Sequence, residues 1–162
     1  MKKTILLAIV FVGVLVLSVG YSDSRYRTAI GRTVPSVVLP SASGDVDLDA
    51  LRGHYVLLNF WKSTDAPSRR SINDYTAWLR RHPSSDVRLV SVNLDETPQM
   101  FREISRRDSL MPSTQFYVGG DTAAAISSTF GLSDGLGTML ISPDGKIIAH
   151  NPTPDRLAEL VR

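Results

Sequence analysis

Asp65 and Ser68 are the two residues whose types and spacing best suit chemistry in this chain. A carboxylate can act as a general acid or base, and a serine hydroxyl becomes a nucleophile when a base, normally histidine, takes its proton. Both follow the apolar run 54–61, where a helix over 66–81 is predicted to begin. The three histidines fall near the ends of other predicted elements: His54, His82 and His150. The sequence therefore supplies no base for Ser68, and we assign no catalytic residue.

The position of Asp65 also suits a structural role. Asp is a favoured N-cap residue, and its charge interacts well with the positive end of a helix dipole. A carboxylate held in this way stays ionised, which makes it a poor general acid. The competing hypothesis is an enzyme of another class that uses Asp65 and Ser68 in one pocket. It requires a histidine or a second carboxylate within hydrogen-bonding reach of either residue.

The sequence contains no recognisable motif for redox chemistry, metal binding or phosphate binding. The chain contains no cysteine, so it can carry out neither dithiol exchange nor disulfide formation. The histidines are too scattered for a metal-binding motif. The glycine pair at 119–120 lacks the lysine and the spacing of a phosphate-binding loop. We therefore expect no cofactor and no metal.

The charge of the chain is concentrated at its start. Lys2 and Lys3 account for the formal net charge of +2 over the 162 residues, and the remaining Lys and Arg residues equal the 16 Asp and Glu residues in number. A formally neutral body argues against a broad phosphate-binding face, so we predict no nucleic-acid partner.

Residues 4–21 carry no charge and are mostly aliphatic, which is typical of an export signal. Ser18 and Gly20 suit cleavage after Gly20, but the run also approaches the roughly 20 residues that span a bilayer. A cleaved signal peptide and a retained single membrane anchor both stay open. We expect this segment at 1–21, a tether over 22–33 and a folded domain over 34–162. The domain should be exported to the cell envelope, either soluble in the periplasm or anchored to the inner membrane.

The folded part alternates predicted strands and helices. Short apolar runs at 37–39 and 46–48 predict an N-terminal β-hairpin. The helix over 97–107 should turn Met100, Phe101 and Ile104 inward. The other expected elements are strands over 54–61, 88–94 and 115–118, helices over 66–81, 122–130 (ended by Gly131) and 154–161, and a hairpin of 138–141 with 146–149. This order predicts an α/β domain with a mixed central sheet, ranked as thioredoxin-like first and flavodoxin-like second.

Four segments, taken in order, resemble one known group. They are Thr33-Val34-Pro35, the Leu-Arg-Gly…Asn-Phe-Trp block over 51–61, the strand 90–95 and the Leu-Ile-Ser-Pro-Asp-Gly segment that begins at Leu140. From about Gly31 onward the chain resembles the exported thioredoxin-like thiol–disulfide oxidoreductases of the TlpA/ResA and peroxiredoxin-related group. The resemblance implies a thioredoxin-like fold, with a central mixed β-sheet flanked by helices.

The same resemblance indicates which positions of this chain correspond to the catalytic cysteines and the cis-proline of the family. The attacking cysteine of the family falls at Asp65 and its resolving cysteine at Ser68, while the family's cis-proline falls at Leu136, followed by Gly137. A non-proline cis bond costs roughly 3–4 kcal/mol, so we expect a trans bond and an altered loop there. The chain is similar to a degenerate member of the family that has lost its redox activity.

Two non-catalytic roles follow as hypotheses. The protein could bind an unidentified envelope protein or peptide, or it could be a structural subunit of an envelope redox or assembly complex. An exposed Trp61 would favour a retained peptide-docking groove, whereas a buried one would belong to the core. The residues expected to form the partner-binding surface are Trp61, Lys62, Thr64, Pro67 and Arg69.

Overall fold

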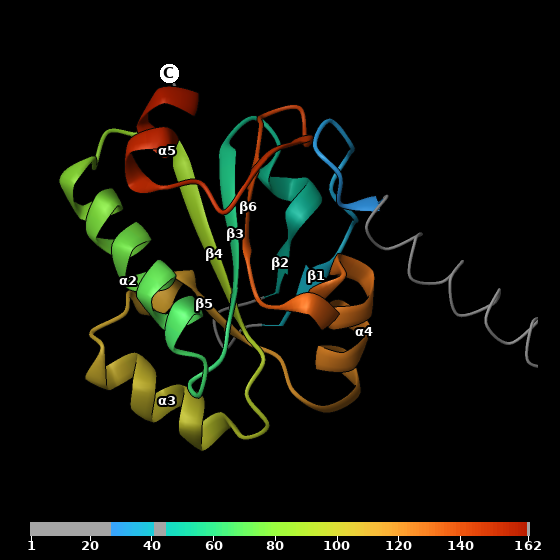
Figure 1. The fold of residues 1–162 in the computed structure, drawn as a ribbon, viewed down its shortest axis with the longest axis vertical. Helices are drawn as coiled ribbons and strands as arrows, with labels where there is room; N and C mark the ends of the chain where they lie inside the picture. The colour runs from blue at the N-terminus through green and yellow to red at the C-terminus, as the bar shows by residue number, and fades with distance from the viewer. Residues whose placement is uncertain (1–26, 41–44, 162) are drawn as a thin grey trace, which may run out of the picture.

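A five-stranded mixed sheet positions the site. The computed structural model describes residues 27–40 and 45–161, and the strand order of its main sheet is β5-β4-β3-β6-β7 (Figure 1). At the centre lies β3 (Tyr55–Trp61), flanked by the parallel β4 (Val87–Asn93) and the antiparallel β6 (Thr138–Ile141). Outside these, β5 (Gln115–Tyr117) runs parallel to β4, and β7 (Ile147–His150) forms a hairpin with β6. The predicted mixed α/β sheet is confirmed.

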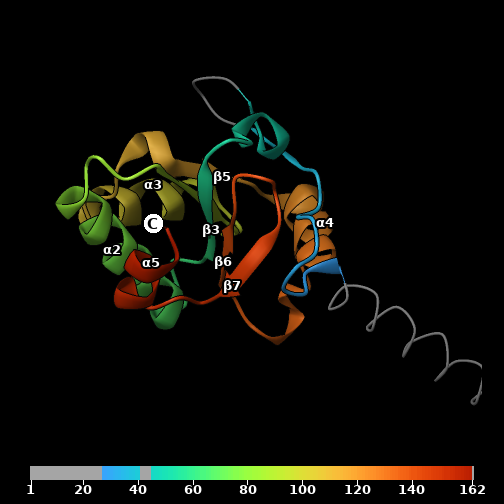
Figure 2. The same ribbon diagram turned by 90° about the horizontal axis from the view of Figure 1, so that it is seen from above.

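Helices cover both faces of this sheet. On one face lie α2 (Ala66–Arg81) and α5 (Pro154–Leu160), and on the other lies α4 (Gly120–Phe130), as Figures 1 and 2 show. The shorter α3 (Pro98–Arg107) lies beyond the end of α2 that follows β3. Two 3-10 turns precede β5 and β6, namely η2 (Pro112–Thr114) and η3 (Leu132–Asp134).

Successive side chains of β3 point to opposite faces of the sheet, so the core has two layers. Val56, Leu58 and Phe60 pack in the α4 layer, whereas Leu57 packs with Tyr75 and other apolar side chains beneath α2 and α5. A strand buried on both faces reads as a continuous apolar run, which is why the segment was predictable. The turn that carries Asp65 follows the carboxyl end of β3 directly.

The ends of two helices show what the sequence could and could not predict. Gly131 has φ +66° and ends α4 as expected, because glycine adopts the left-handed conformation without a steric penalty. The inward orientation predicted for Met100 is wrong, since its side chain is 37% exposed. Helix α3 lies at the rim of the domain, and only Phe101 and Ile104 pack onto the cluster around Trp61.

The segment before β3 forms a second small sheet. β1 (Val38–Leu39) pairs antiparallel with β2 (Val46–Asp47), and a 3-10 turn, η1 (Leu48–Leu51), leads on to β3. The connecting residues 41–44 lie outside the described residues, as does segment 1–21, for which we expect an export signal or anchor. Within the described ranges, no helix has the length and apolar character that a membrane span requires.

Candidate functional site

Asp65 is the N-cap of α2. Its Oδ1 accepts a hydrogen bond from the main-chain N–H of Ser68 over 2.8 Å. The Ser68 hydroxyl is engaged as well: it donates to the carbonyl of Asp65 over 3.1 Å and accepts from the N–H of Lys62 over 3.3 Å. Both residues at the former dithiol positions therefore stabilise the start of the helix, and Ser68 is only 5% exposed.

A buried carboxylate holds the turn before α2 against the end of β4. Asp95, 4% exposed, accepts hydrogen bonds from the N–H of Ser63 (2.7 Å) and from its hydroxyl (2.5 Å). Asn93 Nδ2 donates a third over 3.0 Å. The sequence analysis missed this network. The sequence did hold a signal for it, since Ser63 and Asp95 each follow a buried strand. Adjacent parallel strands end at the same edge of a sheet, so these two residues could have been expected to lie close together.

Trp61 does not belong to any binding surface. Its side chain is fully buried, packs with Ile72 and Leu110, and tilts against the Phe101 ring at a centroid distance of 6.1 Å. Its inclusion in the predicted surface is wrong, because α3 and the segment after it cover the end of β3.

Arg69 has a structural partner. Its guanidinium forms two-point hydrogen bonds with the carboxylate of Asp108 at the end of α3, the shortest at 2.7 Å, and both side chains are largely shielded from solvent. This ion pair ties α2 to α3, so the cation is not free for an acidic ligand. Of the predicted surface, Lys62, Thr64 and Pro67 are exposed.

The former dithiol turn faces the loop at Leu136 and Gly137 across a cleft of about 340 Å³, which we call the Ser68 cleft. All peptide bonds in the described residues are trans, as expected at Leu136. The Phe60 N–H donates to the Gly137 carbonyl over 3.0 Å and holds the loop to β3. The residues that line the cleft come from α2 (Pro67, Ser68, Ser71, Asp74, Tyr75), from the sheet and loop (Asn59, Phe60, Leu136, Gly137, Thr138) and from the segment 151–154.

The floor of the Ser68 cleft is polar. Asn59 is 1% exposed and its Oδ1 accepts from the Thr138 hydroxyl over 2.7 Å, but its Nδ2 has no hydrogen-bond partner among the described residues. The Tyr75 hydroxyl donates to the carbonyl of Pro152 over 2.9 Å. Burial raises the pKa of this phenol, so Tyr75 remains a neutral donor over the physiological pH range.

Asn59 belongs to a row of polar side chains that crosses the sheet. Thr138 on β6 and Ser91 on β4 are its direct register partners, and Gln115 on β5 is paired in turn with Ser91. All four side chains are buried. We call this set the polar rung. Within this set the Thr138 hydroxyl donates to Asn59 Oδ1, whereas Asn59 Nδ2, Ser91 Oγ and Gln115 Oε1 have no hydrogen-bond partner among the described residues.

Asn151 supports the opposite wall of the cleft. Its Oδ1 accepts from the Thr138 N–H over 2.7 Å, and its backbone adopts φ +45°, a conformation that asparagine tolerates better than most residues. The side chain lies so close to the loop that a Cβ at Gly137 would stand 3.0 Å from its Oδ1. A larger residue at position 137 would therefore require the Asn151 side chain to shift by a few tenths of an ångström.

The site has no arrangement for activating a nucleophile. Within the described part of the chain, Ser68 and Asp65 form hydrogen bonds only with each other and with main-chain groups. His54 pairs with Asp86, while His82 and His150 contact main-chain carbonyls elsewhere. The described residues hold no cluster of three or more metal-ligating side chains. Among the described residues, neither a histidine nor a second carboxylate forms a hydrogen bond with Asp65 or Ser68, although the rival enzymatic hypothesis requires one of them within reach.

The fold is that of a thioredoxin-like protein, and Asp65 and Ser68 stand where the sequence resemblance places the dithiol. The AhpC/TSA family model matches residues 30–150. The chain therefore belongs to the AhpC/TSA family, and it lacks the cysteines that thiol–disulfide exchange requires.

Individual relatives agree with this assignment. The thiol-disulfide oxidoreductase ResA of Bacillus cereus is 25% identical over 147 residues, covering 88% of this chain and 83% of that protein. ResA of Bacillus subtilis is 25% identical over 142 residues, covering 83% and 77%. The fold is similar to that of a thioredoxin-like protein from Parabacteroides distasonis (TM-score 0.70, 29% identity, 83% and 95% covered). The thioredoxin domain of a thiol-disulfide oxidoreductase from Bacteroides vulgatus gives a TM-score of 0.74 at 18% identity, with 83% and 99% covered.

Proposed function

We propose that this protein is a redox-inactive thioredoxin-like module of the cell envelope that binds a protein or peptide partner in the Ser68 cleft. The observation that carries the proposal is the cleft itself, which has a volume of about 340 Å³ and lies between the first turns of α2 and the loop at Leu136 and Gly137. The fold persists although the chemistry has gone, and a fold does not require its ancestral activity.

The cleft suits a neutral, extended segment. The main-chain groups of Leu136 form no hydrogen bond within the described residues, so they are available to a peptide backbone. Asp65 already places a negative charge at the start of α2, and Asp74 adds an exposed carboxylate to the lining. An acidic ligand would be repelled by both, whereas a neutral one would not.

The envelope location is part of the same proposal. It is supported by the uncharged aliphatic segment over 4–21 after Lys2 and Lys3, and by the resemblance to an exported group of proteins. A structural role within an envelope complex is compatible with the same cleft, since the partner would then be a permanent one.

Photocrosslinking from the cleft tests the proposal. A benzophenone amino acid at Pro67, which is exposed and lines the cleft, should capture a partner in intact cells. The matched control carries the probe at Ala125, exposed on α4 on the opposite face. A third protein combines the Pro67 probe with Ser71→Trp, which fills the cleft and should abolish capture. Equal capture from both positions, or capture that survives Ser71→Trp, would contradict binding in the cleft.

A further inference from the structure

The outer edge of β4 is only partly covered. β5 pairs with β4 over Ser91–Asn93, and no strand of the described residues pairs with the outer side of positions 87–90. Unpaired strand edges bind extended chains readily, because their main-chain donors and acceptors are already aligned.

The hydrogen-bond pattern shows which groups face this open edge. The Asp86 carbonyl accepts from Tyr55 on the inner side, whereas the Asn93 carbonyl accepts from Val118 on the outer side. Because alternate residues of a parallel strand bond to opposite neighbours, Val87 and Leu89 direct their N–H and C=O groups outward. These four groups have no hydrogen-bond partner in the described part of the chain.

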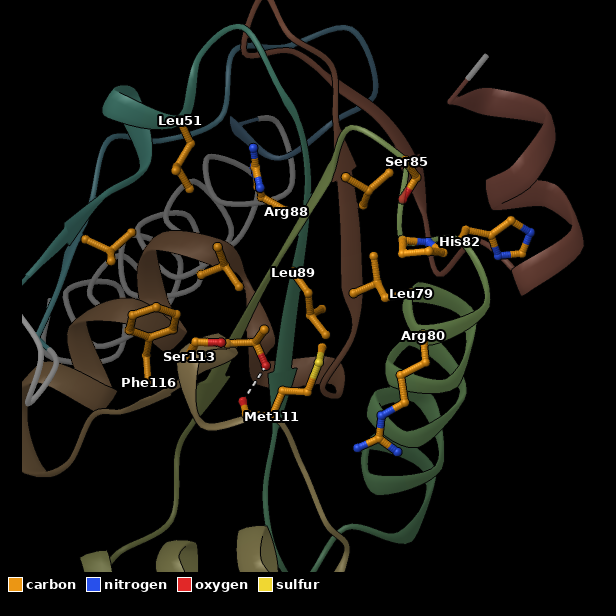
Figure 3. A pocket seen from close by; sticks show the side chains of 15 residues that line it. Leu51, Leu79, Arg80, His82, Ser85, Arg88, Leu89, Met111, Ser113 and Phe116 are labelled. Carbon is orange, nitrogen blue, oxygen red and sulfur yellow. Dashed lines mark hydrogen bonds between the residues drawn. The ribbon is translucent and has the colours of Figure 1, made fainter.

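A groove of about 520 Å³ runs along this edge, and we call it the β4 groove. Figure 3 shows Leu79, Arg80 and His82 of α2 and its C-terminal end on one side, Leu51 and Phe116 on the other, and Leu89 between them. Apolar walls on both faces of an open strand suit the alternating side chains of an added strand.

The charges of the β4 groove favour an acidic occupant. Arg80, His82 and Arg88 line it, and no Asp or Glu is among the described lining residues. The guanidinium of Arg88 forms no ion pair in the described residues, and that of Arg80 donates only to the Ser109 carbonyl. A second copy of the chain paired antiparallel about Arg88 would bring the two Arg88 side chains together, and like charges across paired strands are unfavourable.

We propose that the β4 groove binds an extended, acidic segment of a partner protein, which adds as a strand to the open edge at Val87–Val90. This site is separate from the Ser68 cleft and has the opposite preference for charge. Main-chain bonds to Val87 and Leu89 would provide affinity, and Arg88 would select carboxylates on the face of the added strand that lies opposite α2.

The test uses the full chain, purified in a mild detergent, and a blocked peptide of about eight alternating valine and glutamate residues. On binding, the amides of Val87 and Leu89 should become protected from hydrogen exchange. The amides of Arg88 and Val90, which already face β3, should change little. Failure to bind, or binding that leaves Val87 and Leu89 unprotected, would overturn the proposal.

Three matched comparisons define the mode of binding. A peptide with lysine in place of glutamate should bind at least about tenfold more weakly, and an N-methylated peptide should not bind. Arg88→Glu should weaken binding by a similar factor, whereas Arg70→Glu, an exposed residue of α2 outside the groove, should not. Ser71→Trp should leave binding unchanged, because it alters only the Ser68 cleft. Equal binding of both charged peptides, or loss of binding in Ser71→Trp, would rule out the assigned site.

Discussion

The N–H of Ser68 donates a hydrogen bond of 2.8 Å to the side chain of Asp65, so the two positions at which the resemblance places the dithiol form a helix cap. This bond satisfies one of the free N–H groups of the first turn of α2. The family that the chain resembles is expected to carry its reactive thiols at these positions. Here the two residues stabilise the start of α2.

The first prediction concerns the strength of this cap. Asp65→Ala should lower the free energy of unfolding by about 1 kcal/mol, since it leaves the Ser68 N–H without its partner. Asp65→Asn and Asp65→Ser should lower it much less, because both side chains can still accept the bond. Urea denaturation compares the variants. Equal losses in all three would indicate that Asp65 acts through something other than capping.

The second prediction restores the thiols. The wild-type chain should not reduce insulin disulfides, because it has no cysteine. The variant Asp65→Cys/Ser68→Cys should form a reversible disulfide, since its residues occupy the start of a helix with the spacing of a Cys-X-X-Cys motif. The matched control, Thr64→Cys/Pro67→Cys, keeps the spacing but moves both residues away from the cap. Thiol titration at a series of redox potentials should show the reversible couple only in the first variant.

The third prediction concerns the carboxylate that anchors the turn before α2. Asp95→Ala should destabilise the protein by about 2–3 kcal/mol, because it leaves Ser63 and Asn93 with buried, unpaired donors. Asp121→Ala, at an exposed position in the first turn of α4, is the comparison and should have a much smaller effect. Chemical denaturation measures both, and similar losses would show that the network does not hold the turn.

The fourth prediction tests the close approach in the cleft wall. Gly137→Ala should destabilise the protein by about 1 kcal/mol, since its Cβ would lie 3.0 Å from Asn151 Oδ1. Adding Asn151→Gly removes the contact and keeps the positive φ of that residue acceptable. The double variant should therefore lose less stability than the sum of the two single variants. A thermal unfolding series gives the three values, and simple additivity would refute the contact.

The fifth prediction follows from the raised pKa of Tyr75. Burial disfavours its phenolate in the folded state, so Tyr75 should ionise above the ordinary tyrosine pKa of 10.0. Its contribution to stability is then complete below pH 10 and is lost as the pH rises through the folded-state pKa. Phenolate absorbance in an alkaline titration, compared between wild type and Tyr75→Phe, isolates this group. A difference curve centred at or below the ordinary value would contradict the burial.

The order of elements was predictable because each strand and helix carries its own local pattern. The helix predicted over 66–81 matches α2, since Asp65 and His82 flank a clear apolar stripe. The burial of Trp61 and the exposure of Met100 could not be predicted in this way. Whether each is covered depends on where α3 lies, and the contacts that hold α3, such as the Arg69–Asp108 ion pair, join residues far apart in the sequence.

The site was only partly predictable for a similar reason. Matching to the family located Asp65, Ser68, Leu136 and Gly137, and the structure brings Ser68 and the loop to one cleft. The partners of Asn59, Asp95 and Asn151 are all set by strand register. Register pairs residues far apart in the chain, and no local pattern specifies it here. The open edge of β4 could not be predicted either, because it depends on how few residues of β5 pair with β4.

The polar rung bears on the register of the strands in the sheet. A slip of one residue between β3 and β6 would break the hydrogen bond from the Thr138 hydroxyl to Asn59 Oδ1 and leave buried polar groups without that partner. Misaligned sheets are therefore penalised during folding, whereas an all-aliphatic core would discriminate less between them. The bond between Thr138 and Asn59 thus favours one register of β3 and β6 as the sheet assembles.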